Sequence, residues 1–332
     1  MEGRILAKIE PWTKLTAIVG PTAVGKTAVA LRIAGELKAQ IVSIDAMQVY
    51  RGMDIGTGKP TAVERGSVAM RMLDVADPGE NFSVAHFKEL ADDEVFGVVS
   101  AGNIPLLVGG SGLYFRAVVD DLDFPNVGGT DRWRVEIEEE LEDMDDMELH
   151  DLLVDLDPDA AAEIPPQNRR RVLRAVQVAR QGDRLMSERQ HAWKDYESPY
   201  ELTVAGLDMN RHALYRLIDG RVDRMIADGL EEEVVALKKA GLERGTTAGE
   251  ALGYRQMLEY LDGVKTRDEA VEEIKRRTRN YAKRQLTWFK SDPRVKWFEV
   301  DFKREDPLEK LEAGLDAAAR SILEYIAENL EN

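Results

Sequence analysis

Gly20-Pro21-Thr22-Ala23-Val24-Gly25-Lys26-Thr27 is the stretch of the chain that decides its fold. It fits the pattern G-x-x-x-x-G-K-[ST], in which backbone N–H groups surround a phosphate, Lys26 neutralises it and the Thr27 hydroxyl binds Mg²⁺. The apolar run Leu15 to Val19 before it predicts a strand, and residues 28–38 after it predict a helix whose N-terminus faces the same anion. This agreement favours a polyphosphate site over a glycine-rich turn without a ligand.

Four further apolar runs predict strands, several of them bracketed by helical patterns. They are Ile41 to Ile44, Ile104 to Val108, Leu202 to Ala205 and Val295 to Val300. Such a pattern is typical of α/β proteins, in which helices cover the faces of a mostly parallel sheet. We therefore predict a P-loop NTPase-like parallel sheet flanked by helices.

The composition changes in the middle of the chain. Between Asp131 and Glu163, many acidic residues accompany Leu, Ile and Val at helical spacing. This pattern predicts a mainly helical insertion domain, residues 125–199, within a catalytic core domain formed by residues 1–124 and 200–332. We interpret the acidic run as a solvated helix face rather than an acidic partner-binding site.

Length and composition limit the classes of protein to consider. With 332 residues, 44% of them hydrophobic, the chain can form a large globular core. The absence of cysteine excludes disulfides and thiolate zinc sites, and the four histidines are too scattered for a metal cluster, so we expect any metal to be Mg²⁺ on oxygen ligands. No run resembles a secretory signal or a membrane span. We therefore expect a cytoplasmic protein without a membrane partner, and we take it to be a monomer.

The net charge of −17 argues against general affinity for nucleic acid, yet two basic clusters stand out. Thr266 and Glu269 form a predicted capping box that opens a long helix. No acidic residue lies between Ile274 and Lys290 of that helix, and this stretch carries the first cluster: Lys275, Arg276, Arg277, Arg279, Lys283, Arg284 and Lys290. The second cluster is Arg169, Arg170, Arg171 and Arg174. Two such clusters in an acidic chain favour a polyanionic partner over two solvated faces, because arginine forms bidentate contacts with phosphate.

Two side chains are placed for chemistry beside the loop. Asp45 follows the predicted second strand, and ligands of open α/β sheets bind at the carboxyl edge of the strands. Its carboxylate could hold Mg²⁺ through water or accept a proton from a nucleophile, although an aspartate that only caps the next turn would give the same sequence. Ser111, after the third strand, offers a hydroxyl to the same edge. These residues predict a phosphate-binding enzyme with a carboxylate base and a site for an anionic partner.

The sequence resembles the tRNA dimethylallyltransferases, also called tRNA isopentenyl transferases or IPP transferases, over most of its length. The matching blocks are Gly20 to Thr27, Asp45 to Pro60, Leu107 to Tyr114, Asn168 to Ala175, Ala251 to Met257 and Ala282 to Phe289. Without a cysteine-rich zinc segment, the chain is similar to the shorter bacterial form. It departs from many relatives at Ala46, Ser111 and Met70, where they carry Ser, Thr and His, and the change at Ala46 removes a side-chain hydrogen bond.

The resemblance implies alkyl transfer with Mg²⁺ as the cofactor. The loop would hold the diphosphate of dimethylallyl diphosphate, and N6 of an adenosine next to the tRNA anticodon would take the dimethylallyl group and release diphosphate. Asp45 would be the general base with Ser111 hydrogen-bonding nearby, while Lys26, Mg²⁺ near Thr27 and Arg221 would stabilise the leaving group. The target base would leave its stack and enter a channel through the core domain.

The same resemblance implies which positions face the tRNA anticodon stem-loop. They are Asp45, Ala46, Met47, Gln48, Ser111, Arg134, Arg170, Arg171, Arg174, Gly253, Tyr254, Arg255, Gln256 and Gln285. The insertion domain would then contact the tRNA, and the basic clusters would grip its backbone with an affinity that falls steeply with added salt.

Two other interpretations stay open. A P-loop small-molecule or nucleoside kinase would use the loop for ATP and Asp45 as the base for an acceptor hydroxyl. Against it, no arginine-bearing lid segment is evident, and the basic stripe from Lys275 to Arg284 is larger than a small acceptor needs. The third interpretation is a non-catalytic RNA-binding protein with a vestigial phosphate loop.

Overall fold

The computed structural model describes residues 13–122, 124, 132–181, 185–188 and 196–331, and the chain divides into two compact units. The first unit comprises Met1–Val119 and Pro199–Asn332, and the second comprises Asp120–Ser198. The first contains two large clusters of buried hydrophobic side chains, and the second has a small cluster of its own. The second unit is thus inserted between two segments of the first.

In the described part of the first unit, six strands form one sheet whose neighbouring strands are all parallel. The strands are β1 (Lys14–Val19), β2 (Ala39–Ser43), β3 (Met70–Arg71), β4 (Ile104–Gly109), β5 (Glu201–Met209) and β6 (Val295–Val300). Their order in the sheet is β3-β2-β4-β1-β5-β6. The predicted α/β fold and the five predicted strands are confirmed. The sequence does not predict β3, because two residues are too few for an apolar pattern.

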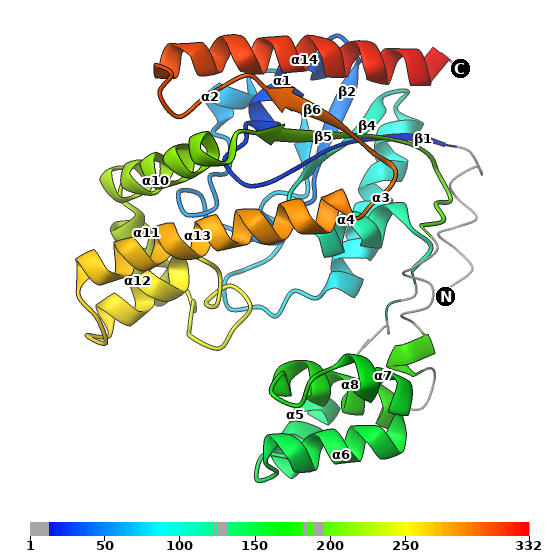
Figure 1. Ribbon diagram of the computed structural model, residues 1–332, viewed down its shortest axis with the longest axis vertical. Helices are drawn as coiled ribbons and strands as arrows, with labels where there is room; N and C mark the ends of the chain where they lie inside the picture. Colours follow the sequence, from blue (N-terminus) through cyan, green and yellow to red (C-terminus); the bar gives the residue numbers. More distant parts are fainter. Residues whose placement is uncertain (1–12, 123, 125–131, 182–184, 189–195, 332) are drawn as a thin grey trace. The chain divides into compact units, whose positions relative to one another are not determined.

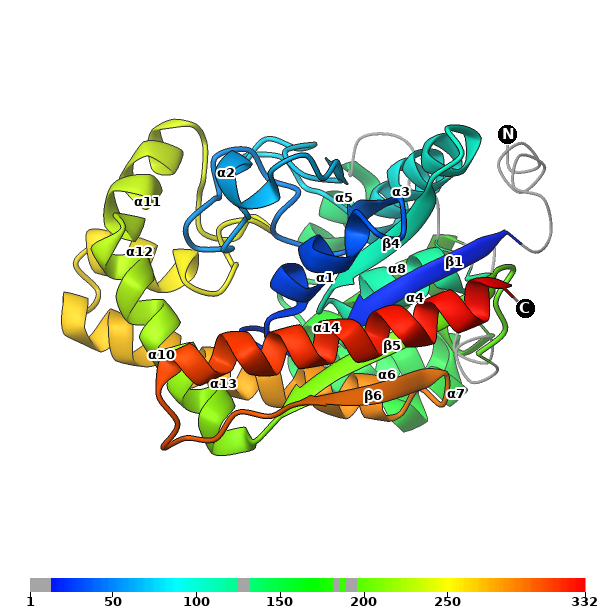
Figure 2. The same cartoon turned by 90° about the horizontal axis from the view of Figure 1, so that it is seen from above.

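One face of the sheet is covered by α1 (Lys26–Ala34) and α14 (Leu308–Glu331), which runs along β5 and β6 (Figure 2). Ile33 of α1 and Ile322 of α14 are buried in one cluster with Ile18 of β1. The inner strands are therefore apolar on this face as well as on the other, which explains their continuous apolar runs.

The first helix is shorter than the sequence predicts. The expected range, 28–38, becomes Lys26–Ala34, with Gly35 as the C-cap residue. Lys38 then takes a left-handed conformation, with φ 51°, that turns the chain directly into β2.

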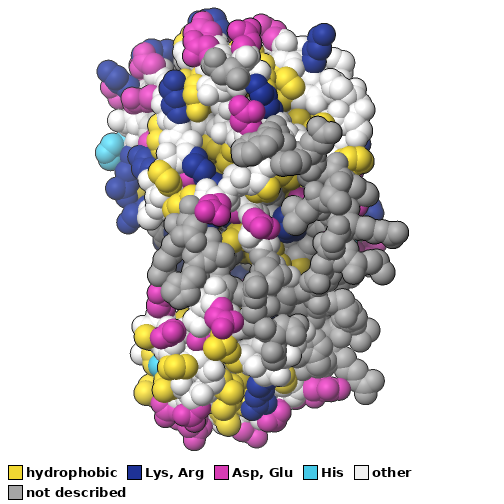
Figure 3. Space-filling model, turned by 90° about the vertical axis from the view of Figure 1, so that its right-hand side faces the viewer, with side chains coloured by type: hydrophobic (Ala, Val, Ile, Leu, Met, Phe, Trp, Pro, Cys, Tyr) yellow, Lys and Arg dark blue, Asp and Glu magenta, His cyan; other side chains and the backbone are white. Residues whose placement is uncertain are grey.

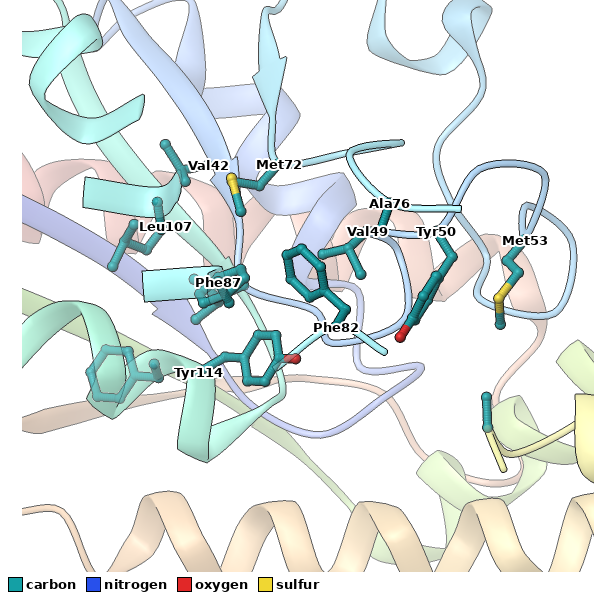
Figure 4. Close-up of a cluster of buried hydrophobic side chains, with 14 of the residues drawn as sticks. Val42, Val49, Tyr50, Met53, Met72, Ala76, Phe82, Phe87, Leu107 and Tyr114 are labelled. Atoms are coloured by element: carbon teal, nitrogen blue, oxygen red, sulfur yellow. The ribbon is translucent and has the colours of Figure 1, made fainter. Parts of the chain in front are cut away.

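The other face of the sheet is covered by α3 (Val84–Ser100) and α4 (Gly112–Val119). Figure 4 shows Phe87 of α3 and Tyr114 of α4 on the same side as Leu107 of β4, and the two ring centroids are 4.2 Å apart. Such aromatic pairs add to the stability that burial alone provides. This core supports the segments that leave β2 and β4.

A short helix, α2 (Ala62–Arg65), lies between β2 and β3, and four longer helices lie between β5 and β6 in the described part of the chain. They are α10 (Arg211–Ala227), α11 (Leu230–Lys239), α12 (Tyr254–Leu261) and α13 (Arg267–Lys290) (Figure 1). α13 begins at the predicted capping box, where Glu269 N donates to Thr266 Oγ1 and Thr266 N donates to the Glu269 carboxylate. It packs against α4, α10 and α12.

The second unit is helical where it is described. Its helices are α5 (Arg132–Glu140), α6 (Asp146–Leu156), α7 (Pro158–Glu163) and α8 (Arg169–Gln181). Leu149, Leu153, Val172 and Val176 are buried in its small core. Figure 3 shows Asp and Glu side chains at its surface, as expected for a solvated helix face.

No helix in the described ranges is long and apolar enough to cross a lipid bilayer.

Candidate active site

Three loops leave the carboxyl edge of the sheet side by side, because β2, β4 and β1 are neighbours. The ends of these strands pair in register: Val19 with Gly109, and Ser43 with Val108. The phosphate-loop sequence, Asp45 and Ser111 follow directly. Parallel strands therefore bring together three segments that lie far apart in the sequence.

The phosphate-loop sequence folds into a turn that requires glycine. Gly25 has φ 99° and precedes α1, and a Cβ at this position would lie 2.4 Å from Leu315. Gly20 has φ 145°, and a Cβ there would lie 2.5 Å from the carbonyl oxygen of Leu207. Ala23 also takes a left-handed conformation, with φ 66°. The helix N-terminus and the N–H groups of this loop suit it to an anion.

A cavity of about 650 Å³ lies against this loop. Lys26, Arg221 and Arg224 line it, and none of the three forms an ion pair with a carboxylate in the part of the chain that the structure describes. Two other cations of the lining, Lys59 and Arg32, are each paired with two carboxylates. Three cations that form no ion pair in the described ranges, beside a phosphate loop, indicate a site for a polyphosphate group.

Two cations of this cavity, Lys26 and Arg221, are withdrawn from water, while Arg224 lies exposed. Burial lowers the pKa of Lys26 to about 7, against the opposing charge of Asp45 and with a contribution from Arg221. Burial also lowers the pKa of Arg221, although a guanidinium stays protonated in proteins. A bound anion would therefore restore the full charge on Lys26.

A second cavity, of about 260 Å³, adjoins the first. The two share five lining residues: Thr22, Asp45, Thr57, Arg221 and Tyr281. Beyond these, the second cavity is lined mainly by apolar side chains: Ile218, Val222, Met225, Leu230, Leu252 and Ile274. The site thus joins a basic cavity, which suits a charged group, to an apolar cavity, which suits an uncharged one.

Asp45 lies at the boundary of the two cavities. Met47 N donates to Asp45 Oδ1 (2.9 Å), while the other carboxylate oxygen has no hydrogen bond with a described residue. Ala46 N donates to Ser111 Oγ (3.1 Å), and Ser111 and Tyr281 line the apolar cavity together with Asp45. Asp45 therefore caps the turn and still has one carboxylate oxygen available to the site, so its part in the chemistry stays a prediction.

Tyr281 is a neutral hydrogen-bonding group beside Asp45. Burial raises its pKa to about 12, with a further rise from the charge of Asp45, while hydrogen bonds with Ser111 and Gln285 oppose the change. Its phenol therefore keeps its proton at neutral pH.

The first cavity fits Mg²⁺ that is bound together with a phosphate. Thr27 lines it, and the Thr27 hydroxyl makes no hydrogen bond with any residue in the described ranges. No group of three or more His, Asp or Glu side chains that could hold a metal by itself occurs among these residues. Mg²⁺ is typically held by one or two protein oxygens, several waters and substrate phosphates, which matches this arrangement.

Comparison with known proteins agrees with this geometry. Residues 48–292 match the family described as IPP transferase, and residues 13–75 match the family described as isopentenyl transferase. A tRNA dimethylallyltransferase of Syntrophomonas wolfei is 44% identical over 302 residues, which are 90% of this chain and 95% of the relative. The chain belongs to the IPP transferase family.

Solved structures of IPP transferases have the same fold. The tRNA isopentenylpyrophosphate transferase of Bacillus halodurans is 40% identical with a TM-score of 0.68, and the match covers 96% of this chain and 98% of that one. The corresponding enzyme of Staphylococcus epidermidis is 33% identical with a TM-score of 0.64, covering 93% and 99%. The two-unit chain is therefore similar to its relatives over almost its whole length.

Several positions that the resemblance assigns to tRNA are buried in this IPP transferase. Thr22 N donates to Gln285 Oε1 (2.8 Å), and Gln285 Nε2 donates to Gly110 O (2.8 Å), so this amide joins the loops after β1 and β4. The side chains of Gln48, Gln256 and Tyr254 are likewise hydrogen-bonded within the protein: to Ser43 Oγ, Gly253 N and Glu233 Oε1. Their geometry favours a positioning role over direct contact with RNA.

Other positions from the same set line cavities of this IPP transferase. Ala46, Met47 and Gly253 line the apolar cavity. Arg255 lines a third cavity, of about 360 Å³, between α12 and α13. Arg170 and Arg171 lie exposed on α8 of the second unit, and Arg174 lies half-buried there. Arg134 is in α5, but its side chain lies outside the described residues.

The two basic clusters are less free than the sequence suggests, which corrects their interpretation as wholly anion-facing. On α13, four members pair with carboxylates: Lys275 with Asp223, Arg277 with Glu273, Arg279 with Asp219, and Lys290 with Asp208. Three of these partners lie on other elements, where the sequence of the helix gives no sign of them. In the second unit, Arg169 donates to the carbonyl oxygens of Leu141 and Met144 and so fixes the turn after α5. Arg276, Lys283 and Arg284 form no ion pair in the described ranges.

Sequence reasoning missed three residues of the IPP transferase site. Arg224 could have been found, since it stands three positions after Arg221 on α10 and so shares its face. The sequence of α13 gives no sign that Tyr281 lies beside Asp45 at the boundary of the two cavities. Thr57 carries no local signal, because its role is to accept a hydrogen bond from Arg221 with its carbonyl oxygen (3.0 Å).

Proposed function

We propose that this protein transfers a dimethylallyl group from dimethylallyl diphosphate to N6 of an adenosine next to the anticodon of tRNA, releasing diphosphate. One observation carries the proposal: the basic cavity at the phosphate loop opens, at Asp45, into an apolar one. A small allylic diphosphate has the same two parts. The family membership supports this choice of donor and acceptor.

The leaving group is stabilised at the loop. The loop N–H groups, Lys26, Arg221 and Arg224 would bind the diphosphate, and they would stabilise the negative charge that grows as the C–O bond breaks. Mg²⁺ held by Thr27 and the phosphates would add charge neutralisation. The dimethylallyl chain would extend past Asp45 into the apolar cavity, where the apolar side chains would shield the reacting carbon from water.

The new bond forms at the boundary of the cavities. Adenine N6 attacks the allylic carbon as the C–O bond breaks, and the electron pair of that bond leaves with the diphosphate. The excess proton on N6 passes to the free oxygen of Asp45. Ser111 holds the turn that carries Asp45 through its hydrogen bond with Ala46 N, and Tyr281 supplies a neutral phenol beside Asp45.

The tRNA would approach along α12 and α13, with the second unit providing further contacts through Arg134, Arg170, Arg171 and Arg174. The third cavity lies there and is lined by Arg255, Arg276, Arg277 and Arg284. A flipped adenine would enter the apolar cavity past Gly253, which lines it.

The test of the proposed function uses purified protein with dimethylallyl diphosphate, Mg²⁺ and an anticodon stem-loop RNA, without ATP. We expect the RNA to gain the mass of one dimethylallyl group minus a proton. A stem-loop without the target adenosine is the control. Transfer of label from ATP to an acceptor, with no mass gain on the RNA, would instead identify a kinase.

The salt dependence of RNA binding should show whether the arginines of the third cavity that form no ion pair with a described residue, Arg276 and Arg284, contact RNA phosphates. We expect Arg276→Ala or Arg284→Ala to weaken stem-loop binding and to make the slope of log affinity against log salt shallower by about 0.7 to 0.9 per charge removed. Arg320→Ala, at an exposed position on α14 outside these cavities, is the matched control and should change neither. Unchanged slopes in the first two variants would remove these arginines from the RNA contact.

A further inference from the structure

Glu233, in the first turn of α11, is the centre of a hydrogen-bond cluster beside the basic cavity. It accepts four hydrogen bonds: from Asp54 N (3.0 Å) and Ile55 N (2.7 Å) at Oε2, and from Gly56 N (3.1 Å) and Tyr254 Oη (2.7 Å) at Oε1. A carboxylate has about four acceptor sites, so this one is fully used. Three consecutive backbone N–H groups converge on it, as they do on an anion bound in a backbone nest. The carboxylate thereby determines the shape of residues 54–56.

The next two residues of this loop, Thr57 and Gly58, contact the guanidinium of Arg221. Arg221 Nη2 donates to Thr57 O (3.0 Å). Gly58 lies against the guanidinium so closely that a Cβ on it would be 1.9 Å from Nη2. Backbone hydrogen bonds from Gly58 N to Ile55 O and from Lys59 N to Asp54 O, both 3.0 Å, make residues 54–59 one compact turn. A change at residues 54–56 therefore displaces Thr57 and Gly58, which contact Arg221.

We infer that Glu233 is a positioning residue for the diphosphate: it holds residues 54–58, and through them it keeps the Arg221 guanidinium directed into the basic cavity. The inference rests on the proposed function for the identity of the donor. Arg221 has no carboxylate partner in the described ranges that could hold it instead. Without the carboxylate, three backbone N–H groups would lose their acceptor and the turn would rearrange to find others.

The first measurement is the binding of inorganic pyrophosphate with Mg²⁺ by calorimetry, which needs no catalysis. We expect Glu233→Gln to weaken this binding by about tenfold or more, because its amide keeps one acceptor oxygen but turns an N–H₂ group toward backbone donors. Glu232→Gln is the matched control, since Glu232 lies exposed in the same helical turn and makes no hydrogen bond with a described residue. It should bind pyrophosphate like the wild-type protein.

A double-mutant cycle separates action through Arg221 from a general loss of stability. Glu233→Gln should cost pyrophosphate affinity in the wild-type background and almost nothing in the Arg221→Ala background, because the group that it positions is already absent. The KM for dimethylallyl diphosphate should rise in parallel, while the KM for the stem-loop RNA stays within about twofold. A merely structural defect would lower the active fraction and leave both KM values unchanged.

Gly58→Ala perturbs the same contact with Arg221 and serves as the test if Glu233→Gln does not fold. It should also weaken pyrophosphate binding, since the new Cβ collides with the guanidinium. Wild-type affinity in the folded Glu233→Gln protein, or in Gly58→Ala, or additive losses in the cycle, would overturn the inference. A wild-type protein that binds pyrophosphate but does not alkylate RNA would overturn the proposed function alone, because the calorimetric comparison of Glu232→Gln with Glu233→Gln would still stand.

Discussion

An Asp45→Asn variant should turn over about a hundredfold or more slowly than the wild-type protein and still bind both substrates. The asparagine keeps an oxygen that can accept the hydrogen bond from Met47 N, so the turn should survive. It cannot take the proton that N6 loses. Because the lone pair of an exocyclic adenine amine is delocalised into the ring, this amine is a poor nucleophile, and removal of the base should be felt strongly in the chemical step.

The effect of Asp45→Asn is measured by single-turnover kinetics with saturating donor and stem-loop RNA, together with equilibrium RNA binding. Asp77→Asn is the control, since Asp77 lies exposed and pairs with Arg51 outside both cavities. We expect RNA affinity within about twofold of wild type in both variants. Turnover of Asp45→Asn within about threefold of wild type would exclude Asp45 as the base, and undetectable turnover of the wild-type protein itself would favour an RNA-binding protein without catalysis.

Lys26→Ala should damage donor binding and turnover together. Its ammonium is one of three unpaired cations at the loop, and removal of one such donor to a developing negative charge typically costs about a hundredfold to a thousandfold in rate. Normal donor affinity in the variant would contradict a role for Lys26 at the diphosphate. Binding of the stem-loop RNA without donor should not change.

The same residue should give donor binding a pH dependence. With a pKa of about 7 in the free site, Lys26 is protonated below pH 7 and loses its proton above it, while the lysine in the complex must keep its charge. Wild-type affinity should therefore fall by up to about tenfold per pH unit above 7. Expressed relative to Lys26→Ala, which cancels the ionisation of the diphosphate itself, the advantage of wild type should shrink as the pH rises. A ratio that is constant between pH 6 and about 9 would show that Lys26 does not titrate there.

The sequence predicts the sheet well because the signals are local. The predicted strands other than β6 are largely buried apolar runs, and the phosphate loop combines a strand, glycines and a helix start within about twenty residues. Parallel pairing then places Asp45 and Ser111 beside the loop, since both follow neighbouring strands. The predicted end of α1 is wrong, because the helix ends at Ala34 although the helical pattern in the sequence continues to Lys38.

The rest of the site depends on contacts between distant residues, which a single sequence does not reveal. Gln285 reaches Thr22 across 263 positions, and Glu233 reaches Ile55 across 178. The basic stripe of α13 suggested seven free cations, but carboxylates of α10 and β5 neutralise three of them. Charge within one helix is therefore a weak guide to the charge that a ligand meets.

The side-chain amide of Gln285 on α13 connects the loop after β1 to the loop after β4. Its two ends fix the gap between Thr22 and Gly110, so the width of the reaction chamber depends on how this helix docks. The outward side chains of the same helix can change without disturbing that gap. The outward face of α13 can consequently change with the choice of RNA, while its inward face, which carries Gln285, keeps the fit of the small donor.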